Sequence, residues 1–332
     1  MMNNVTNITK FWISGFTQAD GSFVVGFEKR NQGLIPYRPR PMFVLSQHVR
    51  EENLFREIQK HLNVGRIQIT RNEVNFIVSS LEEITNVIIP LFDKHPVRDG
   101  KYRSYLVFKK VVEMMNQKEH TTLQGFMTIF ELSYFTHSTS NRTLESKQEI
   151  LTNLKNKFKF LPTISEEILI NSLENSPSAI PLDKEFVRGL VDGDGSFNFS
   201  FKSTRRRVVP NFTVTMGKGD EQVLHDLVKF FDCGKVYSLP SQSSRFQIEN
   251  VNDLLQKVCP FFETNSLITT KQEHFITSVE AWKLLANHSL TDGVLTQLVD
   301  LAYNMNQGGK SRKLSRKQYL TKFIQNSDPL FC

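Results

Sequence analysis

The chain has 332 residues, carries a net charge of +7 at pH 7 and is 39% hydrophobic, so it is long enough for about two globular domains and too apolar to be disordered. No run of about 18 apolar residues occurs, so we expect no membrane-spanning segment. The three cysteines, Cys233, Cys259 and Cys332, suit a reducing compartment and form no zinc-binding pattern. The basic charge favours a polyanionic partner such as nucleic acid, although ordinary basic enzymes carry similar charge.

Apolar periodicity predicts a regular series of elements in the first half. A short helix precedes Asp20, and residues 22–30 alternate as a strand. A loop that carries arginines and prolines follows at 31–41. The remaining predicted elements are strands at 42–48, 66–70 and 74–79 and helices at 52–62, 81–91, 102–115 and 121–135.

The second half repeats this order at a nearly constant offset. For example, FDCGKV at 231–236 matches LNVGRI at 62–67. Its predicted elements include a strand at 196–202, an arginine-bearing loop at 203–210, a strand at 211–216 and a helix at 220–231. Two copies of one series predict an α+β fold made of duplicated αββαββα units. We expect the halves to be residues 1–150 and 183–332, joined by a polar linker at 151–182.

One unusual peptide occurs in both halves. It reads ISGFTQADGSF at 13–23 and VRGLVDGDGSF at 187–197. Small residues recur four apart in each copy, which would let two such helices pack closely. The glycine after each aspartate is typical of a helix end, so Asp20 and Asp194 would lie in the last turn, where the helix macrodipole disfavours a carboxylate. An unfavourable position used twice indicates a function, and two carboxylates at the end of a helix pair suit a hard divalent cation.

These peptides resemble the two LAGLIDADG motifs of single-chain homing endonucleases. The resemblance implies that Asp20 and Asp194, the last acidic residues of the motifs, bind the catalytic metal. It also implies that the motif helices form the interface between two halves of a monomer, related by a pseudo-two-fold axis. The first copy departs from the pattern at Gln18, where the second has Asp192, but this position is not a metal ligand in the family. The resemblance extends over nearly the whole chain.

The strands are expected to bury one face and to turn a polar, mostly basic face outward. A solvated sheet face would show the same alternation, but the charged members are nearly all Arg and Lys. Arginine, Gln, Asn and Ser side chains read base edges in the major groove, and the resemblance implies that each antiparallel sheet binds one half-site of double-stranded DNA. The DNA-binding candidates are Arg30, Arg38, Arg40, Ser46, His48, Arg66, Gln68, Asn75, Ser200, Lys202, Arg205, Arg206, Arg207, Thr213, Thr215, Lys235, Tyr237, Arg245 and Gln247.

Three further residues are candidates for catalysis. Lys101 and Lys271 stand at matching places before long predicted helices, and either could stabilise charge at a scissile phosphate. In the family a lysine near this place flanks the metals, whereas a solvent-facing lysine near a helix start is the alternative. Gln47 is a candidate for ordering solvent, and its counterpart is Met216, so we do not expect the two pockets to be symmetric.

The resemblance implies a site-specific endonuclease that cuts both strands of a long, asymmetric DNA target and promotes the mobility of its intron. The expected cofactor is Mg2+, with Mn2+ or Ca2+ able to occupy the same sites. A maturase that helps group I intron RNA to splice, and a DNA-binding protein that does not cut, remain alternatives, but neither needs both aspartates. The resemblance also implies an organellar setting, for which we expect a mitochondrion rather than a chloroplast. The first residues show neither a signal core nor an arginine-rich transit peptide, which agrees with synthesis inside the organelle, and a bacterial or archaeal source remains an alternative.

Overall fold

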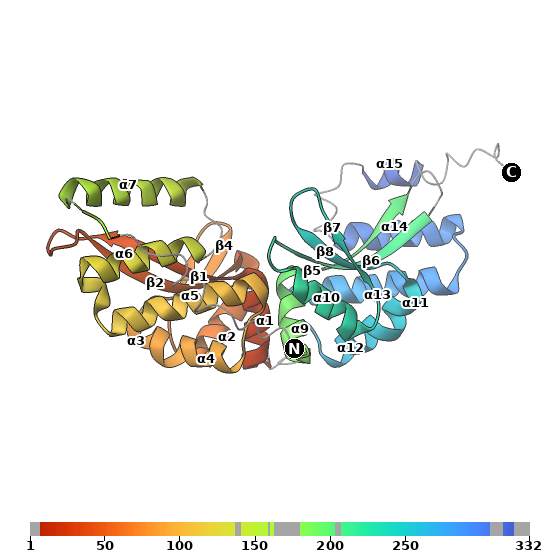
Figure 1. Ribbon diagram of the computed structural model, residues 1–332. Coiled ribbons are helices and arrows are strands. Elements are labelled where there is room, and N and C mark those ends of the chain that lie inside the picture. The colour runs from red at the N-terminus through yellow and green to blue at the C-terminus, as the bar shows by residue number, and fades with distance from the viewer. Residues whose placement is uncertain are drawn as a thin grey trace. The chain divides into compact units, whose positions relative to one another are not determined.

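Figure 1 shows the computed structural model, which describes residues 7–136, 141–158, 160–162, 180–202, 207–305 and 315–321. The chain divides into two compact units, Met1–Pro181 and Leu182–Cys332. Each unit contains one four-stranded antiparallel sheet and a set of helices. Among the described residues, no helix is both long enough and apolar enough to cross a membrane.

The first unit begins with a helix that leads directly into the sheet. Its strands lie in the order β1-β2-β4-β3. Its main elements are α1 Lys10–Asp20, β1 Gly21–Lys29, β2 Tyr37–His48, α2 Glu52–Leu62, β3 Arg66–Ile69, β4 Glu73–Val78, α3 Leu81–Glu83, the π-helical turn η2 Ile84–Ile88, α4 Ile89–Lys94, α5 Asp99–Asn116, α6 Leu123–Leu132 and α7 Asn141–Lys157.

The second unit repeats this topology, with strand order β5-β6-β8-β7. Its main elements are α9 Lys184–Asp194, β5 Gly195–Lys202, β6 Arg207–Met216, α10 Glu221–Phe231, β7 Lys235–Ser238, β8 Ser244–Ile248, α11 Val251–Asp253, η7 Leu254–Val258, α12 Cys259–Thr264, α13 Lys271–Asn287, α14 Asp292–Met305 and α15 Arg316–Leu320. The predicted α+β fold with duplicated units and antiparallel sheets is confirmed.

The phenylalanine that ends each motif lies at the centre of its unit's core. Phe23 is fully buried, and its ring centroid is 5.0 Å from that of Phe92 on α4 and 5.4 Å from that of Phe108 on α5. Phe197 is buried in the same way, 5.3 Å from Phe275 on α13. Burying one such side chain stabilises the fold by about 1.5–3 kcal/mol. These helices therefore cover one face of each sheet, and the alternate strand residues form the other face.

The glycine after each motif aspartate ends its helix, as predicted, but for a different reason. A glycine in the left-handed conformation is the common helix stop. Here Gly21 has φ −96° and Gly195 has φ −70°, both extended, and the strand begins at the glycine itself. A Cβ on Gly21 would lie 2.8 Å from the Thr17 carbonyl oxygen, and one on Gly195 would lie 2.6 Å from the Val191 carbonyl oxygen. Glycine is required because the strand leaves the helix without an intervening loop.

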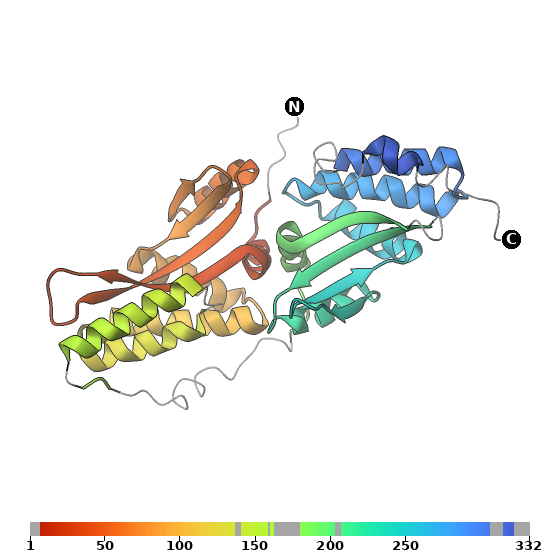
Figure 2. The same cartoon turned by 90° about the horizontal axis from the view of Figure 1, so that it is seen from above.

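The second strand of the first unit is longer than predicted. It begins at Tyr37, and its two prolines lie where it pairs with β1, whereas β4 pairs with it from Phe43 onward. Figure 2 shows this hairpin extending beyond β4. A proline on such a free edge breaks no ladder hydrogen bond. The predicted loop at 31–41 is therefore wrong in its second part, which places Arg38 and Arg40 on the strand with exposed side chains.

The same difference occurs in the second unit. Strand β6 begins at Arg207, and β8 pairs with it from Phe212 onward, so the proline between them again lies outside the β6–β8 ladder. The loop predicted at 203–210 is wrong from Arg207 onward. Arg205 and Arg206 lie outside the described residues.

The helix that follows residue 140 belongs to the first unit and continues to Lys157, into the segment expected to be a linker. Ile150 and Leu154 on this helix are buried in an apolar cluster with Phe126 and Phe130 of α6. Near the unit boundary, the Arg98 guanidinium donates a hydrogen bond to the Ile180 carbonyl oxygen at 2.8 Å. Apolar packing and this hydrogen bond hold both ends of the segment against the first unit.

A prediction follows for the glycine that joins α1 to β1. We expect Gly21→Ala to lower the free energy of unfolding by about 1–3 kcal/mol, because the new methyl group overpacks the last helical turn. Gly26→Ala on the same strand is the control, since the nearest atom to a Cβ there is the Arg40 carbonyl oxygen at 3.7 Å. Urea unfolding followed by circular dichroism measures both, and equal stabilities would contradict the close-approach argument.

Candidate functional site

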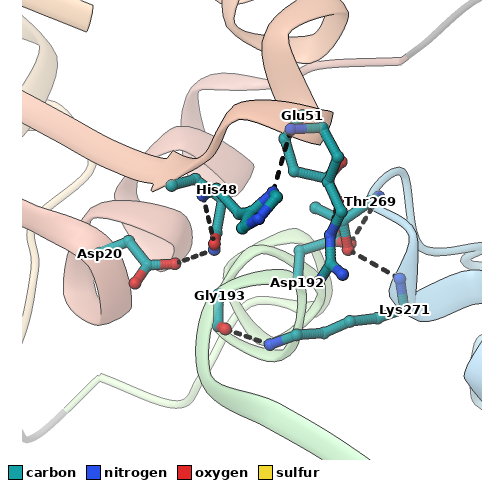
Figure 3. A network of polar contacts seen from close by, with 9 residues as sticks. Asp20, His48, Glu51, Asp192, Gly193, Thr269 and Lys271 are labelled. Carbon is teal, nitrogen blue, oxygen red and sulfur yellow. Dashed lines mark hydrogen bonds and ion pairs between the residues drawn. The ribbon is translucent and has the colours of Figure 1, made fainter. Parts of the chain in front are cut away.

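Each motif aspartate is the last residue of its helix and is half-buried. The Gln47 amide donates from Nε2 to Asp20 Oδ2 at 2.9 Å, one of the dashed contacts in Figure 3. The strand registers pair Gly21 with Leu45 and Gly195 with Val214, so Met216 is the structural equivalent of Gln47. A methionine cannot donate this hydrogen bond. The predicted difference is therefore observed: an amide contacts the motif aspartate in the first unit, and a thioether takes the equivalent place in the second.

The two candidate lysines contact the ends of the motif helices. Lys101 is buried, and its Nζ donates to the Gly21 carbonyl oxygen at 2.6 Å. Lys271 Nζ donates to the Gly193 carbonyl oxygen, as Figure 3 shows, and lies 3.4 Å from the Val191 carbonyl oxygen. A cation at the carbonyl end of a helix offsets the negative macrodipole. Each lysine thus reduces the cost of placing an aspartate there, and the alternative of a solvent-facing lysine is wrong for Lys101.

The acidic position inside the motif positions the lysine-bearing helix. Asp192 is fully buried and accepts hydrogen bonds from Ile268 N at 3.1 Å, Thr269 N at 3.0 Å and Thr269 Oγ1 at 2.7 Å. Gln18 has the same place in the first unit, where its Oε1 accepts from Arg98 N at 2.7 Å. Both side chains hold the segment three residues before the lysine. The carboxylate and the amide therefore serve one role, which explains the departure from the motif at Gln18.

Helix α5 is also held by polar contacts with α4. The Tyr105 hydroxyl donates to Asp93 at 2.6 Å, and Lys109 forms an ion pair with the same carboxylate at 2.8 Å. Burial, with the carboxylate beside it, raises the pKa of Tyr105, so this hydroxyl stays protonated at neutral pH. These contacts fix α5 against α4 and so fix the position of Lys101.

The outer face of the second sheet forms a polar depression of about 370 Å3 with Asp194 in its lining. Gln247 Nε2 donates to Asn211 Oδ1 at 2.6 Å and to Glu249 Oε1 at 2.7 Å, and Arg245 Nε donates to Thr215 Oγ1 at 3.1 Å. The lining residues are Asp194, Ser196, Asn198, Ser200, Lys202, Val209, Asn211, Thr213, Thr215, Arg245, Gln247 and Glu249.

The structure thus brings six of the predicted DNA-binding residues of this unit together with Asp194. Among the polar lining residues, sequence reasoning missed Ser196, Asn198, Asn211 and Glu249. The signal for Ser196 and Asn198 was their place in the strand alternation, whereas Asn211 and Glu249 needed the observed strand pairing. Of the other candidates, Arg207 pairs with Lys202 at the far end of the hairpin, and Lys235 and Tyr237 lie on β7 beside β8.

The outer face of the first sheet carries basic side chains toward its ends and apolar ones in its middle. The Ser46 hydroxyl donates to Asn75, Arg66 donates to Ser79 at 2.9 Å, and Arg40 pairs with Glu28 at 3.3 Å. Gln68 and His48 lie on the same face, whereas Arg30 follows the end of β1. Val24, Met42, Val44 and Ile77 also lie there, half-buried. The expectation of a polar outer face is therefore wrong for the centre of this sheet.

Comparison with known proteins decides the family. A family model described as LAGLIDADG endonuclease matches residues 13–112 and 187–282, which together make up more than half of the chain. The chain belongs to the LAGLIDADG endonuclease family. Each matched segment contains one motif, one sheet and one lysine-bearing helix, so the resemblance inferred from the two motif peptides is confirmed.

Individual relatives are similar to this chain over most of its length. "Probable intron-encoded DNA endonuclease 1" of Mycosarcoma maydis is 50% identical over 274 residues, covering 82% of this chain and 99% of the relative. The solved LAGLIDADG homing endonuclease I-GzeII in complex with its DNA target is 27% identical, with a TM-score of 0.74 over 92% of this chain and 100% of that one. I-SmaMI, bound to uncleaved DNA in the presence of calcium ions, is 23% identical, with a TM-score of 0.76 over 90% of this chain and 99% of that one. The likeness to I-SmaMI shows the fold alone.

A prediction follows for the buried position inside the motif. We expect Asp192→Ala to lower the free energy of unfolding more than Gln18→Ala, because it removes the acceptor for Ile268 N, Thr269 N and Thr269 Oγ1, whereas Gln18→Ala removes the acceptor for Arg98 N. Each buried donor left without a partner costs about 1–3 kcal/mol. Urea unfolding of both variants beside the parent chain measures the difference. A smaller loss in Asp192→Ala than in Gln18→Ala would show that the carboxylate does not hold the segment before Lys271.

Proposed function

We propose that the protein is a homing endonuclease that cuts both strands of a long, asymmetric DNA target and promotes the mobility of its own intron. The observation that carries this proposal is the repeated end of the motif helix. In both units an aspartate ends the helix, a lysine donates to a backbone carbonyl oxygen one residue from that aspartate, and the outer sheet face begins beside them. A protein that only bound nucleic acid would need the sheets but not this arrangement twice.

The residues present suit a hard divalent cation. Among the described residues, no group of three or more His, Cys, Asp or Glu side chains could hold a metal, so a site built wholly from protein ligands does not fit. One carboxylate in each unit fits an ion that takes its remaining ligands from phosphate and water, as Mg2+ does. We propose that Asp20 and Asp194 hold Mg2+, with Mn2+ or Ca2+ able to replace it. The ion would supply an activated water and stabilise the leaving oxygen.

The chain's own residues then have distinct roles in this proposal. Gln47 holds the Asp20 carboxylate in one orientation through its amide and can order a water molecule beside it. Lys101 and Lys271 bring positive charge to the end of each motif helix, where negative charge develops on a scissile phosphate. Because Met216 replaces Gln47 in the second unit, the two strands of the target need not be cut at equal rates.

Each sheet would bind one of two different half-sites of the DNA. In the second unit the depression lined by Arg245, Gln247 and Asn211 offers donors and acceptors for base edges. In the first unit Arg38 and Arg40 project from the long hairpin and suit phosphate contacts. The halves would act as one monomer about a pseudo-two-fold axis, with 1–150 and 183–332 each reading one half-site. The Mycosarcoma maydis relative is named as intron-encoded, which supports synthesis within an organelle, a mitochondrion in our proposal.

Cleavage of DNA tests the function directly. A randomised duplex library incubated with the protein and Mg2+ should yield one recurring sequence cut on both strands. We expect Asp20→Asn and Asp194→Asn to abolish double-strand cutting, with at least a hundredfold loss of rate, because amides bind divalent cations poorly. Both variants should still bind the selected duplex in Ca2+, and this retained binding is the control for folding.

Failure of this test has a clear meaning. Tight, sequence-specific binding without any cutting by the native chain would exclude the nuclease and leave a DNA-binding protein. Binding to structured intron RNA with acceleration of its splicing, and no DNA cleavage, would establish the maturase instead. Cutting that survives either substitution would remove that aspartate from the metal site.

A further inference from the structure

The first sheet carries a continuous apolar stripe on the face opposite the core helices. Val24 on β1 pairs with Met42 on β2, and Val44 on β2 pairs with Ile77 on β4. Met42 and Val44 are two residues apart on one strand, so all four side chains lie on one face and form one patch. All four are half-buried. They lie outside the fully buried core, so packing within the unit does not account for their apolar character.

The second sheet has polar side chains at the same places. The matching registers make Asn198, Asn211, Thr213 and Gln247 the equivalents of the four apolar residues. The Gln247 amide donates both its hydrogens, to Asn211 and to Glu249, so its carbonyl oxygen is what it can offer to a ligand. Duplicated units that present opposite chemistry at equivalent positions indicate two different ligands, not one repeated contact.

Charge around the stripe restricts the kind of partner that covers it. Arg40 lies two residues from Met42 on β2 and also pairs with Glu28, and Arg66 on β3 pairs with Ile77 on β4. Both arginines are exposed. The surface therefore suits a partner that places apolar groups within an anionic frame. The major groove of DNA does this at thymine, whose 5-methyl group is the apolar element of the base-pair edge, flanked by phosphates.

We propose that the first sheet recognises thymine through its methyl groups, using Val24, Met42, Val44 and Ile77. This inference rests on the proposed function, because it assumes that the sheet lies in the major groove of a DNA target. It assigns to the first half-site a run of thymines on the strands that face the stripe. The second half-site, read by the polar equivalents, has no such requirement.

Replacing thymine by uracil removes only the methyl group and provides the test. The native protein and the target selected by cleavage are used, with each thymine changed singly to deoxyuridine, and dissociation constants are measured in Ca2+. We expect a cluster of adjacent positions in one half-site at which uracil weakens binding about fourfold each, which is about 0.8 kcal/mol per buried methyl group. Thymines in the other half-site should tolerate the change.

A substitution in the stripe tests whether its side chains cause the uracil effect at that cluster. Ile77→Gln gives the first unit the residue that the second has at Gln247, and it should abolish the uracil effect at one or more positions of the cluster. Gln247→Ala is the matched control, which should leave the ratio of thymine to uracil affinity unchanged there. A target that is bound and cut equally well with uracil throughout would overturn this proposal while leaving the endonuclease intact. A chain that neither binds nor cuts any duplex would instead refute the proposed function.

Discussion

The direct passage from helix to strand at each motif is the constraint on which the rest of the structure depends. Gly21 and Gly195 let the strand leave the helix at once, because any side chain there would collide with the preceding turn. The aspartate is thereby fixed at the point where helix and sheet meet. Lysine amines on the backbone carbonyls next to each aspartate offset the unfavourable end of the macrodipole. One local geometry thus places an aspartate, a lysine and the start of the outer sheet face together in each unit.

Different side chains hold this helix–strand junction in the two units, but the lysine is positioned beside the motif helix in both. Asp192 and Gln18 use different acceptors to hold the same segment, and both keep the lysine in register with the motif. In contrast, Gln47 and Met216 are not interchangeable, because the Gln47 amide donates to the Asp20 carboxylate and a thioether has no hydrogen to donate. Positions that fix the frame tolerate substitution by a residue of similar hydrogen-bonding capacity, whereas positions that face the carboxylate give the two units different chemistry.

Strand pairing determines which side chains lie on the outer faces of the two sheets. The prolines of β2 and β6 lie outside the ladders with β4 and β8, which lets long hairpins form and places Arg38, Arg40 and Arg207 on strands. Pairing also brings Asn211 and Glu249 to Gln247, and assembles the apolar stripe of the first unit from three separate strands. These surfaces are made of residues distant in sequence.

The sequence by itself determined the duplication, the α+β class, the two motif aspartates and the matching lysines, because each depends on local spacing repeated in two copies. It also indicated the asymmetry between Gln47 and Met216. It could not show the buried role of Asp192, the extended conformation of Gly21 or the apolar centre of the first sheet. Those features depend on which strands pair and on which backbone atoms approach one another, and only the tertiary structure decides both.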